Sequence, residues 1–404
     1  MLRRIGPSLF LSIGIALLGS GEVAGADDLR RSLIEMLGIP PLGGPTHAES
    51  RGVVEHDGIM VEKWVFTAEP GSKVPALLFR PAKPAGKMPV VVFTYGHGSS
   101  KSAWSYQYAA MLYAKLGLAS LAIDPIGEEE RHVDGRMGSR AHDNAAADAR
   151  AAAADRLIMG KLVFDTMRGI DWLATRDDID MSRVAVAGYS LGGAKASWMA
   201  ALDGRLRAAL VCGWAYDDIV LPTKLCQKVP FTAMRKLADW PGFIAMAAPH
   251  CAILFANGDV DAVIDRNDRG VWTRSQSNLD AARPRWAERP ERAPQAYLEH
   301  EAGHRPFFAY REALVFLHGQ GMLPGATVES LKSMPTINAG QWCDRYGIEL
   351  EKLYGTQLHW RGATLADLKI VPLAPSELAV LNPDERGSAD FTIEGWLDRI
   401  EGKQ

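Results

Sequence analysis

The sequence predicts an α/β protein in which a mostly parallel central sheet is covered by helices on both faces. Short apolar runs alternate with helical stretches from residue 88 to residue 320, as expected when parallel strands are buried on both sides. One run, Val184–Ala187, leads directly into a Gly-rich turn, Gly188–Gly193, and then into the helical stretch Ala194–Leu202. This strand, turn and helix are the feature around which the other elements can be ordered.

The remaining elements follow with glycine and proline between them. Residues 27–37 have helical spacing, and β-rich segments predict an antiparallel meander at one edge of the sheet, at residues 52–56, 60–67 and 74–80. The other expected strands are 88–94, 119–123, 208–214, 251–256 and 295–298, and the other expected helices are 104–116, 144–154, 157–174, 266–294 and 311–320. Residues 215–249 look irregular, and the tryptophan-containing stretch 321–404 predicts an ordered appendage on the core rather than a disordered tail.

The N-terminus has the features of a secretory signal peptide. Arg3 and Arg4 form a basic start, Leu9–Leu18 is apolar, and Ala24-Gly25-Ala26 is a small-residue cleavage site. The apolar run is too short to span a bilayer. We therefore expect residues 1–26 to be removed, no stable membrane insertion afterwards, and a secreted or periplasmic protein; an N-terminal membrane anchor is the alternative.

Composition excludes several classes of partner. The 404 residues are 47% hydrophobic and 23% charged with a formal net charge of −3, so no basic excess suggests nucleic acid or an anionic membrane. Export would permit disulfides among the four cysteines, Cys212, Cys226, Cys251 and Cys343, in three possible pairings. Cys212 and Cys251 lie in apolar strands and could equally be buried thiols. The chain has no C-x-x-C spacing, which disfavours a zinc or redox site.

Ser190 lies in a G-x-S-x-G pattern between a strand and a helix. Such a turn holds the serine backbone in a strained conformation with close neighbours, where a Cβ on the flanking residues would clash. It lifts the hydroxyl above the sheet edge, towards the N–H groups that begin the following helix. The pattern predicts a nucleophile that needs a neighbouring base. The competing interpretation is a Gly-rich turn of another α/β fold.

A base and an orienting carboxylate are expected just past the ends of later strands. His304 follows the last strand and is the preferred base among ten histidines, with His300 as the alternative. Asp261 is the preferred carboxylate because it stands far enough past its strand to turn back towards a histidine. Asp259 and Asp265 are alternatives, and Asp259 has the position of a turn residue.

The charge that develops on an attacked carbonyl needs two N–H donors, an oxyanion hole. The backbone N–H of Leu191, directly after the serine, is the first candidate. The second should come from the Gly-rich turn that follows strand 88–94. There the backbone of His97 is preferred, and that of Ser99 is the alternative.

A series of motifs resembles the α/β-hydrolases of the dienelactone-hydrolase and acetyl-xylan-esterase-like branch. In chain order these are Tyr95–Lys101 (YGHGSSK), Asp124–Arg131 (DPIGEEER), Asp165–Leu173, Asp180–Arg183, Gly188–Gly193, Ala248-Pro249, Asn257–Asp261 and Gly303-His304. The resemblance covers roughly residues 50–320. Tyr95 replaces the usual first histidine and His250 stands where arginine is common, but neither belongs to the expected triad.

The resemblance implies an α/β-hydrolase fold with an insertion after the sixth strand of that fold, at residues 215–249. We expect a signal peptide (1–26), an N-terminal helix and edge strand (27–62), a catalytic domain (63–320) and a C-terminal appendage of unknown role (321–404). Aromatic residues in and beside the insertion could form a sugar or acyl platform or could be core packing: Trp214, Tyr216, Phe231 and Trp240.

The resemblance also implies an exported serine esterase that works through an acyl-enzyme, with Ser190 as nucleophile, His304 as base and Asp261 as orienting acid. No metal or cofactor is expected, and the implied substrate is a small-molecule or carbohydrate ester, with acetylated carbohydrate favoured. Two alternatives stay open. One is a prolyl-oligopeptidase-type peptidase, although the chain lacks a propeller-sized N-terminal domain; the other is a non-catalytic binding module on the same fold.

Overall fold

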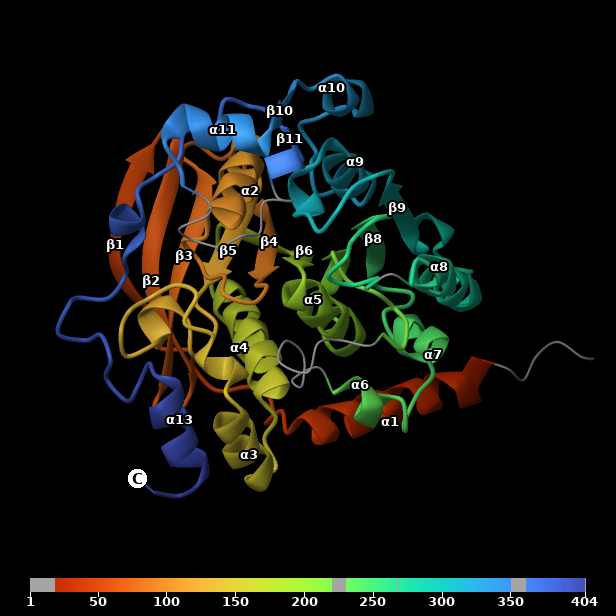
Figure 1. The fold of residues 1–404 in the computed structure, drawn as a ribbon, viewed down its shortest axis with the longest axis horizontal. Coiled ribbons are helices and arrows are strands. Elements are labelled where there is room, and N and C mark those ends of the chain that lie inside the picture. The colour runs from red at the N-terminus through yellow and green to blue at the C-terminus, as the bar shows by residue number, and fades with distance from the viewer. Residues whose placement is uncertain (1–18, 220–229, 267, 350–360, 404) are drawn as a thin grey trace, which may run out of the picture.

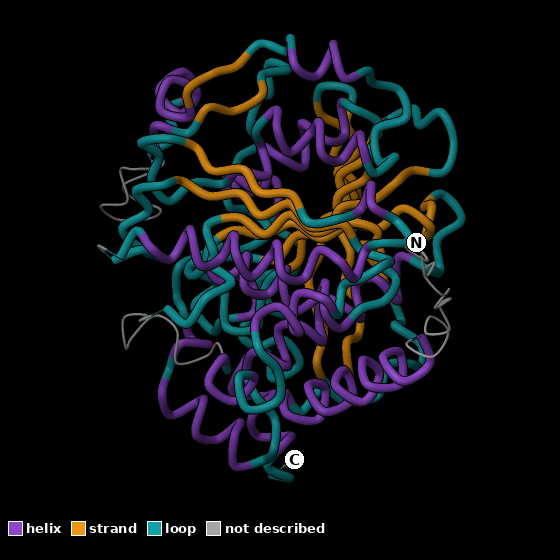
Figure 2. Tube along the Cα trace, turned by 90° about the vertical axis from the view of Figure 1, so that its right-hand side faces the viewer, coloured by secondary structure: helices purple, strands orange, loops and turns teal. Residues whose placement is uncertain are grey.

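The computed structural model describes residues 19–219, 230–266, 268–349 and 361–403. Within them, a twisted nine-stranded sheet has helices on both faces (Figures 1 and 2), which confirms the predicted fold class. The strand order is β1-β2-β3-β5-β4-β6-β7-β8-β9. The strands are β1 (Glu49–His56), β2 (Ile59–Glu69), β3 (Ser72–Pro81), β4 (Met88–Thr94), β5 (Ala119–Ile123), β6 (Ile179–Tyr189), β7 (Leu206–Cys212), β8 (Ala252–Gly258) and β9 (Gln295–Glu299).

The sheet has an antiparallel edge and a parallel body. β1, β2, β3 and β5 pair antiparallel, which confirms the predicted meander. From β5 through β4, β6, β7 and β8 to β9 every pair is parallel. Parallel strands present their carboxyl ends at one edge of the sheet, so the loops after β4, β6, β8 and β9 meet there.

Helices cover both faces of the parallel strands, which explains their continuous apolar sequences. Every residue of β4, MPVVVFT, is buried. On one face, Phe93 contacts Tyr106 and Tyr113 of α2 at 5.5 and 6.0 Å between ring centroids. On the other, Gly169 of α4 lets the helix approach Leu121, because a Cβ there would lie 2.9 Å from the leucine side chain. The covering helices are α2 (Trp104–Lys115), α4 (Ile158–Leu173), α5 (Leu191–Leu202), α8 (Gly270–Ala282) and α9 (Arg311–Gly319).

The N-terminal helix is longer than the sequence suggests. α1 spans Gly19–Leu37, whereas the sequence pattern predicts a helix from residue 27, so α1 crosses the predicted cleavage site. The first 18 residues of the predicted signal peptide lie outside the described residues. The predicted boundary between the N-terminal segment (27–62) and the next domain (63–320) falls inside β2, which runs from Ile59 to Glu69. No helix within the described residues combines the length and apolar character needed to cross a bilayer.

The insertion after β7 packs into the core. Residues 230–249 contain two short helices, α6 (Phe231–Met234) and α7 (Trp240–Ala245), and residues 220–229 lie outside the described part. The four aromatic side chains for which a platform and core packing were both considered are at most 9% exposed. Phe231 bridges two of them, at 5.5 Å from Trp214 and 4.7 Å from Trp240 between ring centroids. These rings are therefore core packing and do not form an open sugar platform.

The described residues after 320 lie along the central sheet and its helices. Figure 1 shows them running from α11 near α2 to α13 beside α3. Tyr108 donates a hydrogen bond to the carbonyl of Ala366 (2.7 Å), and the Glu130 carboxylate accepts the N–H groups of Val380 and Leu381. The elements involved are α3 (Ala145–Ala153), α10 (Val328–Lys332), β10 (Thr336–Asn338), α11 (Ala339–Tyr346), β11 (Thr364–Ala366) and α13 (Ile393–Ile400). Buried hydrogen bonds thus join the appendage to the core.

Two of the described cysteines are free thiols. Cys212 and Cys251 are free and buried, which favours the buried-thiol interpretation of both, and Cys343 is buried as well. Cys226 lies outside the described residues.

Glu69 provides an acid-sensitive link between the appendage and the core. Its carboxylate binds Lys161 (2.6 Å) and Arg156 (3.1 Å) and accepts the indole N–H of Trp396 (3.0 Å). Burial alone would raise the pKa of Glu69, but Lys161 and Arg156 outweigh it and lower the pKa from 4.5 to about 2.

We predict that Glu69 stabilises the fold most above its unfolded pKa and that this contribution is lost as pH falls towards 2, by about 3 kcal/mol in total. Urea unfolding of wild type and Glu69→Gln should show a stability difference that is largest at pH 6 and shrinks by about 2 kcal/mol at pH 3. Glu49→Gln, at a carboxylate that is 60% exposed, serves as the control with little pH dependence. A Glu69→Gln difference that does not change with pH would contradict the prediction.

Candidate active site

Ser190 occupies a strained turn between β6 and α5. Its backbone has φ 62° and ψ −130°, a conformation that costs a non-glycine residue about 1–3 kcal/mol and persists only where the surroundings enforce it. The surroundings do so: the Ser190 N–H donates to the carbonyl of Cys212 (3.0 Å), and its own carbonyl accepts the N–H of Ala194 (3.1 Å). The turn therefore has the geometry that the sequence pattern predicts.

The glycines around Ser190 are required by close backbone approach. A Cβ at Gly188 would lie 2.2 Å from the Gly192 carbonyl oxygen, and one at Gly192 would lie 2.3 Å from the Thr94 carbonyl oxygen. The Thr94 hydroxyl also donates to the Gly192 carbonyl (2.7 Å). The start of α5 is thus pressed against the end of β4, which brings the turn after β4 next to the serine.

Gly192→Ala should destabilise the fold by about 2–4 kcal/mol, because the new Cβ meets backbone that cannot give way. Gly204→Ala is the matched control, since a Cβ there meets nothing within 4 Å. Urea unfolding of the two variants checks this; equal stabilities would show that the turn is less tightly packed than described.

His304 and Asp261 form a buried pair beside this turn. The His304 Nδ1 and Asp261 Oδ2 atoms lie 2.6 Å apart, and the side chains are 4% and 0% exposed. The other oxygen of Asp261 accepts the N–H groups of Val263 and Ile264 (3.0 and 3.3 Å), which fix the carboxylate. The imidazole packs on the ring of Tyr189, the residue before the serine, at 4.6 Å between centroids. The predicted base and carboxylate therefore meet at the serine turn.

The alternative residues form a separate pair at the surface. His300 Nδ1 lies 2.8 Å from Asp259 Oδ2, and His300 is 85% exposed. Its hydrogen bond to Asp259 raises the pKa of His300. Asp259 also accepts the N–H of Glu301 (2.7 Å). Asp265 lies one turn beyond Asp261 and donates its N–H to the Asp261 carbonyl (2.8 Å).

The turn after β4 lies against the serine. A Cβ at Gly96 would be 3.2 Å from the Cβ of Ser190. The Gly96 N–H donates to the Tyr106 hydroxyl (3.1 Å), and the Ser99 N–H donates to the Gly96 carbonyl (3.3 Å). Because the Ser99 N–H already donates a hydrogen bond within the turn, the geometry favours His97 over Ser99 as the second predicted oxyanion donor. Leu191 is the first residue of α5, where a backbone N–H precedes the helical hydrogen-bond ladder.

Behind this turn lies a cluster of titratable side chains that the sequence patterns did not predict. Glu128, Lys195 and His142 are 0%, 3% and 1% exposed, and the side chains of His97 and Asp143 are 8% and 9% exposed. Burial raises the pKa of Glu128 to about 7 and lowers that of Lys195 to about 7. No local sequence pattern connects these residues. His97 and Asp143 are far apart in the sequence, and Asp143 lies in an irregular stretch.

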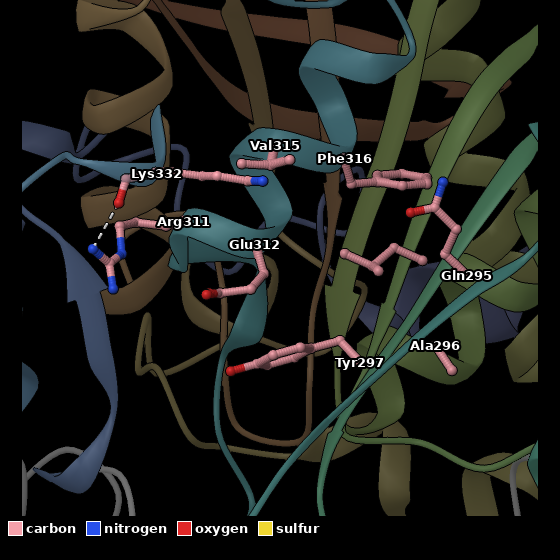
Figure 3. Close-up of a pocket in the computed structure, with 9 residues that line it drawn as sticks. Gln295, Ala296, Tyr297, Arg311, Glu312, Val315, Phe316 and Lys332 are labelled. Atoms are coloured by element: carbon pink, nitrogen blue, oxygen red, sulfur yellow. Dashed lines mark hydrogen bonds between the residues drawn. The ribbon is translucent and has the colours of Figure 1, made fainter. Parts of the chain in front are cut away.

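A cavity of about 270 Å³ lies away from the triad residues (Figure 3). It opens at the edge strand β9, between β9, α9 and the end of α10, and its lining includes Gln295, Tyr297, Glu312 and Lys332. None of the predicted catalytic residues lines it. Among the described residues, no cluster of three or more His, Cys, Asp or Glu side chains is arranged to hold a metal ion.

The strand order and the strained serine turn at the strand ends define the chain as an α/β-hydrolase. Residues 53–216 match the model of the acetyl xylan esterase family. This stretch of the chain is therefore similar to acetyl xylan esterases, and the protein is a carboxylic ester hydrolase with the α/β-hydrolase fold.

Relatives by sequence are distant. A protein of Bacillus subtilis (strain 168), YtaP, whose name describes it only as a hydrolase, is 25% identical over 207 residues, which are 48% of this chain and 67% of YtaP. An uncharacterised protein of Mycobacterium tuberculosis (strain H37Rv), Rv2307c, is 26% identical over 256 residues, or 62% of this chain and 76% of that protein.

Three solved structures share the fold at low identity. The methylesterase BT1017 has a TM-score of 0.56 at 17% identity and covers 94% of this chain and 73% of its own. A glucuronoyl esterase from Solibacter usitatus has a TM-score of 0.54 at 14% identity, covering 72% and 91%. Acetyl xylan esterase 1 from Thermoanaerobacterium sp. JW/SL YS485 has a TM-score of 0.50 at 16% identity, covering 73% and 93%. At these identities the likeness concerns the fold alone.

Proposed function

We propose that the protein is an exported serine esterase that removes acetyl groups from carbohydrate, with Ser190, His304 and Asp261 as its catalytic triad. The observation that carries the proposal is the buried His304–Asp261 pair, 2.6 Å apart, packed against the residue that precedes the strained serine. A serine hydroxyl needs a base to become a nucleophile, and the base needs a carboxylate to fix its tautomer.

In the acylation step, the Ser190 Oγ attacks the ester carbonyl while His304 takes the hydroxyl proton. Asp261 stabilises the resulting imidazolium and does not take up a proton itself. The backbone N–H groups of Leu191 and His97 hold the oxyanion of the tetrahedral intermediate, each worth about 3 kcal/mol in this role. When the intermediate collapses, the sugar oxygen leaves with the proton from His304, and the acetyl group stays on Ser190.

Deacylation repeats the same steps with water. His304 takes a proton from the water molecule, whose oxygen attacks the acetyl carbonyl. The second tetrahedral intermediate expels the Ser190 oxygen, which recovers the proton from His304, and acetate leaves. The reaction is complete without a redox change.

Substrate class and export rest on different observations. The match to the acetyl xylan esterase family supports small acyl groups on carbohydrate. The solved structures of similar fold include a methylesterase and a glucuronoyl esterase, so a methyl ester of a sugar acid is the closest competing substrate. The basic start, apolar run and small-residue cleavage site at residues 1–26 support export.

Product analysis on matched substrates tests the proposal. Acetylated xylo-oligosaccharides, the methyl ester of glucuronic acid and a chromogenic dipeptide are incubated with wild type. We expect acetate release to exceed methanol release by at least about 100-fold in kcat/KM, a gap of about 3 kcal/mol in transition-state binding. Dominant methanol release would replace the acetyl substrate with the methyl ester, and cleavage of the peptide alone would favour the peptidase alternative.

A further inference from the structure

We infer that Asp143 is a positioning residue for ester hydrolysis, because it holds the His97 side chain and thereby the turn whose backbone binds the oxyanion. This inference rests on the proposed function. It names a residue outside the triad, between β5 and α3, in the part of that segment that follows the Asp124–Arg131 motif.

The His97 and Asp143 side chains lie close together and are buried, at ion-pair distance and outside hydrogen-bond geometry. The His97 Nε2 and Asp143 Oδ1 atoms lie 3.2 Å apart, and the two side chains are 8% and 9% exposed. The ring of His97 also stacks on His142 at 6.2 Å between centroids, with 24° between the planes. The His97 imidazole is thus buried against Asp143 and His142. The neighbouring Gly96 lies against Ser190, so His97 connects the serine turn to the segment that carries Asp143.

Asp143 is held firmly enough to act as an anchor. It precedes Asn144, whose side chain caps α3 by accepting the N–H of Ala146 (2.8 Å). Its own N–H donates to the carbonyl of Arg140 (2.8 Å). The Asn144 cap fixes the start of α3 and with it the position of Asp143. Asp143 can therefore restrict the His97 turn that it contacts.

Glu128 also holds the segment that carries Asp143, through buried contacts to residues 138, 140 and 142. Its carboxylate accepts the N–H groups of Gly138 (2.9 Å) and Arg140 (3.0 Å), and its Oε1 lies 3.8 Å from His142 Nδ1. The Arg140 side chain in turn sits over the His97 turn, since a Cβ at Gly98 would be 3.2 Å from the Arg140 Nε. The segment from residue 127 to 143 therefore supports the turn from behind.

Asp143 also lies near a buried lysine. Lys195 comes from α5, the helix that begins after the serine; burial lowers its pKa to about 7, and Glu128 and Asp143 partly oppose that shift. Removing the Asp143 carboxylate takes away the contact to His97 and one of the two acidic neighbours of Lys195. We expect the turn to relax away from Ser190, and a displacement of about 1 Å in a catalytic group can cost about 100-fold in rate.

The test compares Asp143→Ala and Asp143→Asn with Asp259→Ala. Asp259 is a matched control because it also contacts a histidine, at 2.8 Å, but at the surface. With p-nitrophenyl acetate, we expect Asp143→Ala to lower kcat by about 10- to 100-fold with KM changed less than about 3-fold, and Asp143→Asn to lose less. Asp259→Ala should stay within about 2-fold of wild type.

A double-mutant cycle separates positioning from general damage to the fold. His97→Ala keeps the backbone N–H but removes the side chain that Asp143 holds. If Asp143 acts through His97, the double variant is no slower than the slower single variant; if the two losses in kcat multiply, the inference is wrong.

Two further outcomes keep this inference distinct from the proposed function. Wild-type kcat in Asp143→Ala and Asp143→Asn, with Ser190→Ala inactive, would overturn the positioning role alone. Full activity in Ser190→Ala would overturn the proposed function and the inference that rests on it.

Discussion

Replacing Ser190 with alanine is expected to lower kcat for ester hydrolysis by about 10⁴- to 10⁶-fold, because the variant has no oxygen to form the acyl-enzyme. The protein should remain folded. Alanine has a smaller side chain than serine, and the turn is held by the backbone hydrogen bond to Cys212 (3.0 Å) rather than by the hydroxyl. Steady-state assays with p-nitrophenyl acetate and urea unfolding measure both quantities.

His304→Ala provides the internal check on this expectation. Residues that act as a unit show strongly non-additive losses, so the double variant Ser190→Ala/His304→Ala should be about as slow as either single variant. A further large drop in the double variant would mean that the two residues serve separate reactions. His300→Ala is the control, since His300 is 85% exposed and pairs with Asp259, and it should retain wild-type kcat.

Lys101→Met is expected to have the largest effect on stability, about 3–5 kcal/mol, because it leaves buried carboxylates without their cation. The Lys101 ammonium is 0% exposed and lies 2.8 Å from Asp124, 3.0 Å from Glu129 and 2.8 Å from Glu130. Burial alone would lower the pKa of Lys101, but these three carboxylates raise it. Methionine fills a similar volume, so the loss reports charge rather than a cavity.

The pH dependence of that loss has a definite sign. Burial and Glu129 raise the pKa of Asp124 and Lys101 opposes them, so the pKa should rise further when Lys101 is replaced. A carboxyl whose folded pKa is raised above its unfolded value costs stability as pH rises. The deficit of Lys101→Met should therefore be largest near neutral pH and should shrink as pH falls towards 5. Urea unfolding at several pH values measures it.

Lys115→Met is the matched control for the cluster. Lys115 also pairs with a carboxylate, Asp57, at 2.6 Å, but the two side chains are 23% and 41% exposed. An exposed pair of this kind contributes at most about 1 kcal/mol. Equal losses in the Lys101 and Lys115 variants would show that the buried cluster does not need its cation.

The serine turn was predictable because its determinants are local. Gly188, Ser190 and Gly192 stand next to a β-branched strand and before a small-residue helix, so sequence order alone indicates the geometry. The strand ends carrying Asp261 and His304 were predictable for a related reason. In a parallel sheet, residues that follow successive strands meet at one edge, whatever their separation in sequence.

Features that depend on distant contacts could not be predicted in this way. The pattern did not indicate that Asp143 meets His97, because Asp143 belongs to an irregular segment whose path is set by Glu128 and by the start of α3. The motif containing Lys101 was visible in the sequence, but its burial among three carboxylates was not. The same holds for Glu130, which binds the N–H groups of Val380 and Leu381 some 250 residues later.

Aromatic residues alone did not separate packing from carbohydrate binding. The rings around the insertion were open to both interpretations, with packing favoured, because aromatic rings serve both purposes. In the fold, Trp214 and Tyr216 are each 1% exposed, so packing accounts for them. The helix that begins at Gly19 rather than at residue 27 shows that helix boundaries are less certain than helix positions.

The central claim is that Ser190 carries the acyl group, and covalent trapping tests it most directly. Wild type and Ser190→Ala are treated with a fluorophosphonate, digested and analysed by mass spectrometry for the modified residue. We predict a phosphonate adduct on Ser190 that appears together with loss of esterase activity and is absent from Ser190→Ala. An adduct on a different residue, or undiminished ester hydrolysis by protein in which Ser190 is fully modified, would contradict the claim.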